Sequence, residues 1–315
     1  MQAAVIDAYG PPEVVRVLEV PRPAPRTGQV LVRIRAAAVT SADSRVRGAR
    51  FPDGFGLPAR LVFGVRRPRR PILGSCVSGA VEAVGPGVQG FMPGDEVCGM
   101  SGLAMGAHAQ YVAVPASRLV AKPPAVSHDD AAGVLFGGTT ASFFLRDKAA
   151  VRPGTTVLVN GASGAIGTNA VQLAKHLGAT VTGVTSTPNL TLVGELGADH
   201  LIDHTRQNLL ATTERFDVVL DTVGNLPVTA ARRLLRTNGM LLLAVANLGD
   251  TIRARGQVVT GTSPERTDDF RFLLQLVAEG ALTVVNDRTY GLDDVVEAHQ
   301  RVDSGRKVGN VILRP

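Results

Sequence analysis

Apolar residues in the first 120 positions fall into short, valine-rich runs that are separated by Pro and Gly. Runs of this kind, bounded by turn residues, predict short β-strands. We expect such strands at 14–20, 29–37, 79–84 and 110–114, with turns at 85–87 and 93–95. The N-terminal part of the chain should therefore form an irregular barrel or sandwich.

The pattern changes near Ser127, where a serine followed three residues later by Asp130 favours a helix N-cap. Beyond residue 155, strand-like and helix-like runs alternate. We expect strands at 156–159, 180–184, 216–221 and 239–245, and helices at 165–177, 190–196 and 228–235. This alternation predicts right-handed crossovers and a parallel sheet. A further helix at 265–280 and a final strand at 307–313 complete the expected elements.

Length and composition narrow the class of protein. The 315 residues suffice for about two domains, and 45% apolar with 19% charged residues is an ordinary globular mixture. No apolar run approaches ~18 residues, and no basic stretch with a long apolar segment opens the chain. Cys76 and Cys98 are too few for a disulfide framework. We expect a cytoplasmic protein without a membrane partner.

The net charge of +6 is concentrated in one segment. Between Arg45 and Arg70 there are eight arginines and a single acid, Asp53. Such a segment forms either an anion-attracting surface, for nucleic acid or an acidic partner, or a solvated loop. Because Pro and Gly punctuate it, we favour the loop.

The most informative motif is a glycine-rich turn in which Gly161, Gly164 and Gly167 stand three residues apart. It follows an apolar strand directly and opens an amphipathic helix. Missing Cβ atoms let a backbone turn approach a pyrophosphate, and the helix N-terminus favours the anion. The motif therefore predicts dinucleotide binding by Gly161, Ala162, Ser163, Gly164, Ala165, Ile166 and Gly167. The alternative is an ordinary turn with packing glycines.

The end of the second strand indicates which dinucleotide binds. A site for NAD usually carries Asp or Glu about 20 residues after the first glycine. No acid occurs here between Asp147 and Glu195, and the strand ends at Ser186 and Thr187. Hydroxyl groups without a nearby carboxylate favour the 2′-phosphate of NADP.

These residues together resemble the medium-chain dehydrogenase/reductase superfamily, and specifically its zinc-independent, quinone oxidoreductase-like branch. The resemblance extends over nearly the whole chain. It is carried by residues 71–74, 79–85, 93–97, 106–112, 159–167, 196–199, 217–224 and 309–312.

The resemblance implies an α/β protein with two domains and a cleft between them. Residues 1–122 and 281–315 would form a β-rich, GroES-like substrate domain, and residues 123–280 a Rossmann domain with a doubly wound parallel sheet. It places Thr140 near the nicotinamide and Ser186 and Thr187 at the 2′-phosphate. His204 would contact the cofactor, Lys307 and Asn310 would close the site, and we expect a homodimer.

The chain departs from the family pattern in the substrate cleft. Thr40 replaces an asparagine, and Ser75-Cys76 replaces an acid. The six histidines show no paired ligand spacing, so we expect no zinc. Thr40, Asp43 and Ser44 are weak catalytic candidates, Tyr111 fits a structural role, and packing is favoured for Cys76 over a reactive thiol.

Without a metal, plain alcohol oxidation is harder to support than reduction of a conjugated carbonyl, which needs orientation and a proton source. We therefore expect an NADPH-dependent oxidoreductase that transfers hydride to a quinone or enone. Two alternatives stay open. One is a non-catalytic NADPH-binding sensor or nucleic-acid-binding protein, and the other is a tailoring enzyme for a larger metabolite.

Overall fold

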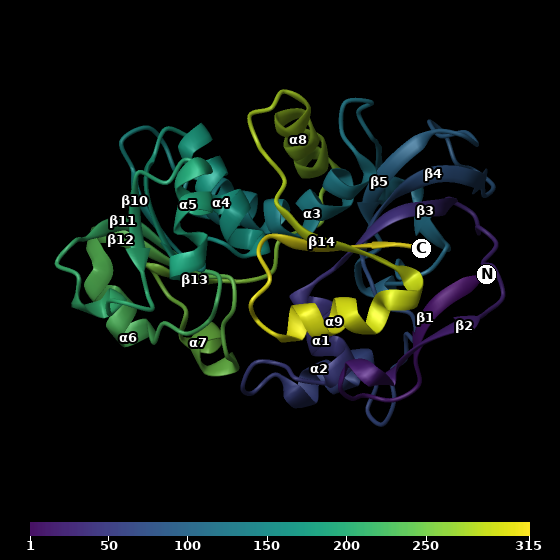
Figure 1. Cartoon of the computed structure of the whole chain (residues 1–315), viewed down its shortest axis with the longest axis horizontal. Coiled ribbons are helices and arrows are strands. Elements are labelled where there is room, and N and C mark those ends of the chain that lie inside the picture. The colour runs from purple at the N-terminus through teal and green to yellow at the C-terminus, as the bar shows by residue number, and fades with distance from the viewer.

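The computed structural model describes all 315 residues and contains two large sheets, one in each half of the molecule (Figure 1). The first is a mixed seven-stranded sheet in the order β14-β15-β3-β4-β5-β7, with β6 also paired to β3. Its strands are β3 (Gln29–Val39), β4 (Cys76–Val84), β5 (Glu96–Met100), β6 (Tyr111–Pro115), β7 (Leu119–Ala121), β14 (Asn286–Gly291) and β15 (Asn310–Arg314). A separate hairpin pairs β1 (Gln2–Ile6) with β2 (Val15–Glu19).

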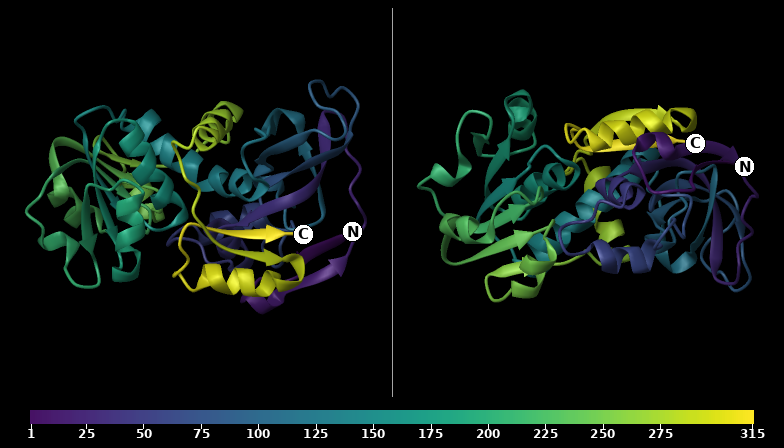
Figure 2. Two further views of the ribbon diagram at one scale, coloured as in Figure 1. Left: turned by 45° about the horizontal axis from the view of Figure 1, so that its top comes forward. Right: turned by 90° about the horizontal axis from the view of Figure 1, so that it is seen from below.

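The end of the chain returns to this N-terminal sheet. β15 pairs antiparallel with β3, with Val311 opposite Val39. Figure 2 shows helix α9 (Val295–Asp303) beside the first hairpin, in the half of the molecule that holds the N-terminus. The sheet is therefore built from both ends of the sequence. The domain boundaries at 122/123 and 280/281 stay a prediction.

The second sheet has six parallel strands in the order β10-β9-β8-β11-β12-β13. Counted along the chain from β8, this is 3-2-1-4-5-6, the usual Rossmann order. Its strands are β8 (Thr156–Asn160), β9 (Thr180–Thr185), β10 (His200–Asp203), β11 (Phe216–Asp221), β12 (Leu235–Leu243) and β13 (Val258–Thr260). The prediction of a parallel sheet is confirmed.

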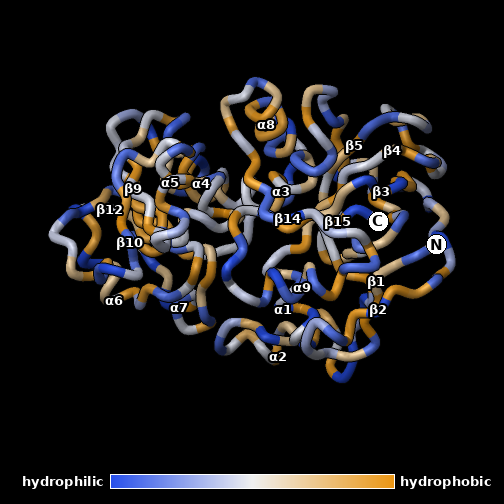
Figure 3. Tube along the Cα trace, viewed as in Figure 1, coloured by the Kyte–Doolittle hydropathy of each residue, from blue (hydrophilic) through white to orange (hydrophobic).

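Most predicted helices of this half are confirmed within a few residues. These helices are α4 (Ala165–His176), α5 (Leu190–Glu195), α6 (Val228–Ala231) and α8 (Thr267–Ala278), and the structure adds α7 (Leu248–Arg253), which the sequence analysis did not predict. Gly178 and Gly197 follow the first two in the left-handed conformation, which a side chain disfavours. Figure 3 shows hydrophobic residues concentrated along the strands that these helices cover.

The helix predicted at 228–235 is confirmed up to its last residue. Residues 228–234 form a single α-helical turn followed by a short 3₁₀ turn, and β12 begins at Leu235 rather than at Gly239. Leu235 pairs with Phe216 of β11, and the register then shifts before Val218 meets Met240. The strand therefore begins earlier than the sequence predicts, directly after the helical turns.

The basic segment is not the simple solvated loop that the sequence favoured. It contains α1 (Ser41–Gly48) and α2 (Gly56–Phe63). Thr40 caps α1 through a reciprocal pair of bonds with Asp43. Arg47 is fully buried and pairs with Asp303 of α9, 256 residues away in sequence. A partner so distant could not be identified from the local pattern.

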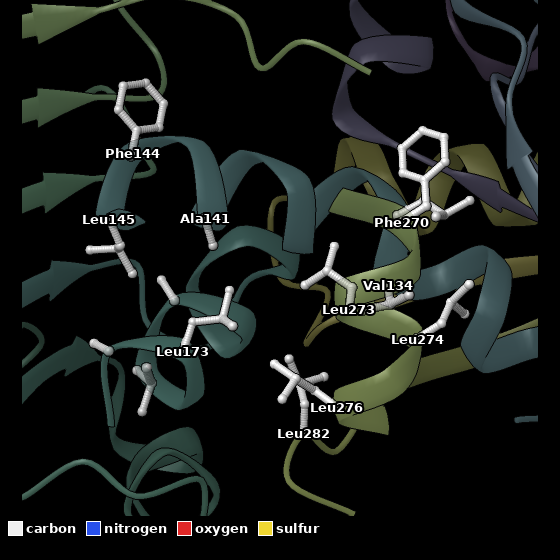
Figure 4. Packing of buried hydrophobic residues seen from close by; sticks show 14 of the residues in the cluster. Val134, Ala141, Phe144, Leu145, Leu173, Phe270, Leu273, Leu274, Leu276 and Leu282 are labelled. Atoms are coloured by element: carbon white, nitrogen blue, oxygen red, sulfur yellow. The ribbon is translucent and has the colours of Figure 1, made fainter. Parts of the chain in front are cut away.

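A long helix, α3 (His128–Ser142), connects the two halves. Its predicted N-cap is confirmed, because the Ser127 hydroxyl accepts from the Asp130 amide at 3.1 Å. Figure 4 shows Val134 and Ala141 of α3 among side chains of α4 and α8. The same buried apolar cluster reaches Ala36 of β3 and Val157 of β8, so the two sheets share a core.

No helix of the protein is both long enough and apolar enough to cross a bilayer.

Candidate cofactor and substrate site

The glycine-rich turn connects β8 to α4. Gly161 has φ of +82°, and a Cβ there would lie 2.6 Å from the Thr222 hydroxyl. A Cβ on Gly167 would come within 2.7 Å of the Ala162 backbone. These two glycines are required by the close packing of the turn itself.

Gly164 differs from its two neighbours in the motif. Its backbone is extended (φ −78°), and a Cβ would meet only the Gly161 carbonyl, at 3.5 Å. The amides of Ile166 and Gly167, in the first turn of α4, donate to no acceptor in the chain. The turn thus presents open space beside free N–H groups, which is the form of a phosphate cradle.

The cradle is tied to the end of β9. The Ser163 hydroxyl accepts from the Thr185 hydroxyl at 2.9 Å and from the Asn189 amide at 3.2 Å. Asn189 also donates to the Ser186 hydroxyl at 3.2 Å. Ser186 is therefore held beside the turn, where the predicted ribose site would lie, and Thr187 and His204 are exposed next to it.

One premise of the cofactor argument is corrected here. Asp203 lies at the end of β10, in register with Thr185, and its carboxylate accepts from the hydroxyls of Thr187 and Thr205. A carboxylate is thus present, although none occurs near this strand end in sequence. Hydrogen bonds from Thr187 and Thr205 hold the pKa of Asp203 below its usual value. Arg206 also lies close enough to lower it.

The C-terminal segment closes over the cradle from the other half of the molecule. The Gly309 amide donates to the Ser163 carbonyl at 2.8 Å. Lys307 donates to the Gly309 carbonyl at 2.6 Å, and burial lowers the pKa of its ammonium to about 8. The Asn310 amide is buried and donates to the Val285 carbonyl at 2.9 Å, so it supports this segment.

Thr140 approaches from α3. Its hydroxyl is nearly buried and donates to the Phe136 carbonyl at 2.7 Å. One turn earlier, Gly137 packs so closely on the start of α4 that a Cβ would lie 2.9 Å from Asn169. The structure therefore packs the helix that carries Thr140 on α4 and links Lys307 to the glycine turn through Gly309, whereas the role of Thr140 at the nicotinamide stays a prediction.

A cleft of about 320 Å³ opens between the two halves, next to the carboxyl ends of β11 and β12. Its lining residues come from both halves: Arg45, Arg50, Phe51, Pro52, Asp53, Gly224, Leu226, Leu243, Val245, Ala246, Asn247 and Asp250. The Leu248 amide donates to the Asp53 carbonyl at 2.8 Å and joins the two walls. In the Rossmann order, this side of the switch point receives the second half of a dinucleotide.

Buried Asp221 shapes the Rossmann wall of the cleft. Its carboxylate accepts from the amides of Val223, Gly224 and Leu226 at 3.0 to 3.2 Å. It also accepts from the Asn160 side chain at 2.9 Å. These bonds fix the loop after β11 against the end of β8, so Asp221 is a positioning residue.

The three catalytic candidates, Thr40, Asp43 and Ser44, make structural contacts. Asp43 is buried and accepts from the Thr40 amide at 2.8 Å, from the Thr40 hydroxyl at 2.6 Å and from the Gly74 amide at 3.0 Å. The Ser44 hydroxyl donates to Asp303. Neither Thr40, Asp43 nor Ser44 lines the cleft, and their catalytic role stays a prediction.

Thiols and metal ligands offer no further chemistry at this site. Cys76 and Cys98 are free and buried, and burial raises the pKa of both thiols, that of Cys98 to about 12. Such thiols act as packing groups.

Tyr111 lies in β6, as its strand motif indicated. No group of three or more His, Cys, Asp or Glu side chains has an arrangement that could hold a metal ion.

Sequence reasoning missed the residues that line the cleft, above all Arg45 and the segment 245–247. One signal was available: Thr40 and Asp43 have the spacing of a capping box, which predicts a helix that carries Arg45. The segment 245–247 follows β12 directly and so lies at the carboxyl edge of a parallel sheet, where ligands bind.

Known proteins resemble this chain over its whole length. A family model described as an alcohol dehydrogenase GroES-like domain matches residues 26–124, and one described as a zinc-binding dehydrogenase matches residues 196–313. A 2-haloacrylate reductase from a Burkholderia species is 30% identical over 343 residues, covering 100% of this chain and 99% of that protein.

Solved structures agree with these matches. A quinone oxidoreductase from Coxiella burnetii has a TM-score of 0.90 and 26% identity, covering 100% of this chain and 99% of that one. A mycobacterial protein complexed with NADPH has a TM-score of 0.82 and 28% identity, covering 100% of both chains.

Proposed function

The chain belongs to the quinone oxidoreductase-like branch of the medium-chain dehydrogenase/reductase family, and from this premise we propose that it reduces a conjugated carbonyl compound with NADPH. The carrying observation is the phosphate cradle around Gly164, which lies beside a cleft at the carboxyl ends of β11 and β12. A dinucleotide bound across this edge would bring its nicotinamide toward the cleft. The relatives, a 2-haloacrylate reductase and a quinone oxidoreductase among them, act on acceptors of this kind by their names.

The chain's own contribution is orientation of the acceptor. When bound, NADPH supplies two electrons and one hydrogen to the β-carbon of the acceptor, and a solvent proton completes the adjacent carbon. Phe51, Leu226 and Val245 give the cleft an apolar wall. No histidine, tyrosine or cysteine lines it, and we assign the proton to water. Positioning of the acceptor is the main catalytic effect expected.

We assign the 2′-phosphate of NADPH to Ser186, Thr187 and His204, with Arg206 as the nearby cation. The hydroxyl of Ser186 has capacity for another bond, because it accepts only one from Asn189. The negative charge of Asp203 would repel the 2′-phosphate, but its oxygens already accept hydrogen bonds from Thr187 and Thr205. The NADPH complex of the mycobacterial relative adds support.

We expect Ser186→Asp to lower the preference for NADPH over NADH by at least about 10-fold, because a carboxylate there repels the 2′-phosphate and accepts from a free ribose hydroxyl. The measurement is kcat/KM with each cofactor. Ser186→Ala is the matched control and should change the ratio by less than about 3-fold. Equal effects of the two substitutions would contradict the assignment.

The proposed activity is tested by following NADPH absorbance with a panel of quinones, enones and saturated ketones. Turnover of the conjugated acceptors with no reaction of the saturated ketones is the expected result. Tight NADPH binding without turnover of any acceptor would overturn the proposal.

The non-catalytic alternatives are not favoured. Arg47 is buried in an ion pair, Arg45 lines the cleft and Arg60 lies over the Tyr9 ring, so these three arginines are not free for nucleic acid. We further propose a cytoplasmic homodimer that works without zinc. The proposal that zinc is not needed is supported by the side chains, because no three His, Cys, Asp or Glu residues are placed where they could hold a metal ion. Metal analysis and light scattering of the purified protein test zinc content and subunit number.

A further inference from the structure

Arg45 is the unusual charge of the cleft. It lies on α1, is half-buried, and its guanidinium makes neither a hydrogen bond nor an ion pair. Burial alone, with no compensating carboxylate, lowers its pKa. Taking a charge partly out of water without a partner costs free energy, so a half-buried, unpaired cation in a cleft points to an anionic ligand.

The other charged residues of the cleft are engaged elsewhere or exposed. Arg50 pairs with Asp303 at 2.5 Å. Asp250 accepts from the Asn247 side chain at 2.8 Å, and its amide donates back to Asn247 at 2.7 Å to cap α7. Asp53 is exposed to solvent. Neither carboxylate lies within ion-pair distance of Arg45, whose charge is therefore uncompensated.

The place of Arg45 separates it from the phosphate cradle. The phosphate cradle is at the end of β8, whereas Arg45 faces residues that follow β11 and β12. A guanidinium presents paired N–H groups that match the two oxygens of one carboxylate. Because Arg50 is paired with Asp303, one unpaired arginine remains in a cleft of about 320 Å³, and this fits a small monocarboxylate better than a phosphate ester, which takes several donors.

We propose that Arg45 binds a carboxylate of the substrate, so that the natural acceptor is a small α,β-unsaturated carboxylic acid. The proposal rests on the function proposed above and specifies its substrate class. The ion pair would hold one end of the acceptor on α1 while the conjugated carbons lie between the two walls of the cleft. Arg45 would then determine specificity without exchanging a proton.

The test compares crotonate with crotonamide, its neutral isostere, in wild type and in Arg45→Gln. We expect Arg45→Gln to lower kcat/KM for crotonate about 10- to 100-fold, mainly through KM, and to change the value for crotonamide by less than about 3-fold. Arg45→Lys should recover part of the crotonate activity. Arg66→Gln, which changes an exposed arginine outside the cleft, is the control and should leave the crotonate-to-crotonamide ratio within about 3-fold of wild type.

Failure of the inference is distinguishable from failure of the proposed function. If quinones and enones are reduced but Arg45→Gln leaves the crotonate-to-crotonamide ratio unchanged, the carboxylate site is wrong and the reductase stands. If no acceptor is reduced, binding of butyrate and butyramide to the NADPH complex is measured by calorimetry. Arg45-dependent binding of butyrate alone then supports the site. Equal binding of butyrate and butyramide overturns the carboxylate site. A loss of NADPH affinity in Arg45→Gln as large as the loss of butyrate affinity also overturns it.

Discussion

Gly164→Val should raise the Kd for NADPH by about 100-fold, equivalent to about 2.7 kcal/mol, while the protein remains folded. The backbone at Gly164 is extended (φ −78°), so a side chain causes no local strain. A Cβ there would project into open space beside the free amides of Ile166 and Gly167. Valine would fill the volume that the pyrophosphate needs. Cofactor fluorescence titration measures Kd, and circular dichroism checks folding.

Two other glycines separate binding from folding. Gly194→Val is the matched control, because Gly194 also has an ordinary backbone and a Cβ there meets only Leu201, at 3.6 Å. It should leave the Kd unchanged. Gly167→Ala should instead destabilise the fold, since its Cβ would overlap the Ala162 backbone. Unchanged NADPH affinity in a folded Gly164→Val protein would remove the basis of the reductase proposal.

Arg47→Met should lower the free energy of unfolding by about 3 kcal/mol, because it breaks a buried ion pair from one side. Arg47 is fully buried and donates to Asp303 at 2.5 Å and to the Gly10 carbonyl at 2.6 Å. Its loss would leave the Gly10 carbonyl unpaired and Asp303 with only Arg50 and Ser44. The expected fall in Tm, roughly 6–10 °C, is measured by calorimetry.

The control for Arg47→Met is Arg271→Met, which breaks an exposed pair with Asp268 and should cost less than about 1 kcal/mol. The pH dependence adds an independent check. Burial would raise the pKa of Asp303, but bonds from Ser44, Arg47 and Arg50 hold it below its usual value. This stabilisation is present above about pH 4, the usual pKa of an aspartate, and is lost as the pH falls. Arg47→Met should therefore flatten the acid limb of the stability profile, and an unchanged limb would argue against the pair's importance.

The shared core explains how a site is formed between two sheets. α3 packs on α4 at Gly137 and reaches the N-terminal sheet through the same apolar cluster. The Gly309 amide and the Asp53 carbonyl add polar links on either side of the cleft. The walls are therefore held at a defined separation, which orientation of an acceptor requires.

The sequence by itself determined the parallel sheet, its helices and the glycine-rich turn that joins β8 to α4. Each depends on short-range physics: alternating apolar runs, glycine at positive φ, and a helix N-terminus directly after a strand. The start of β12 was predicted four residues late because Leu235 pairs with Phe216, a contact that the local pattern does not encode. The sequence did not predict the carboxylate of Asp203 at the cofactor site for a similar reason, because the pairing of β10 with β9 brings it there.

The tertiary structure alone decided the substrate cleft. Arg45 meets the loops after β11 and β12 only because residues 200 positions apart are folded against each other. Arg47 and Arg45 are two residues apart on one helix, yet one is paired in the core and the other is unpaired in the cleft. Sequence gives both the same charge. Which of them finds a carboxylate depends on long-range packing, because electrostatic partners are chosen by distance in space and not along the chain.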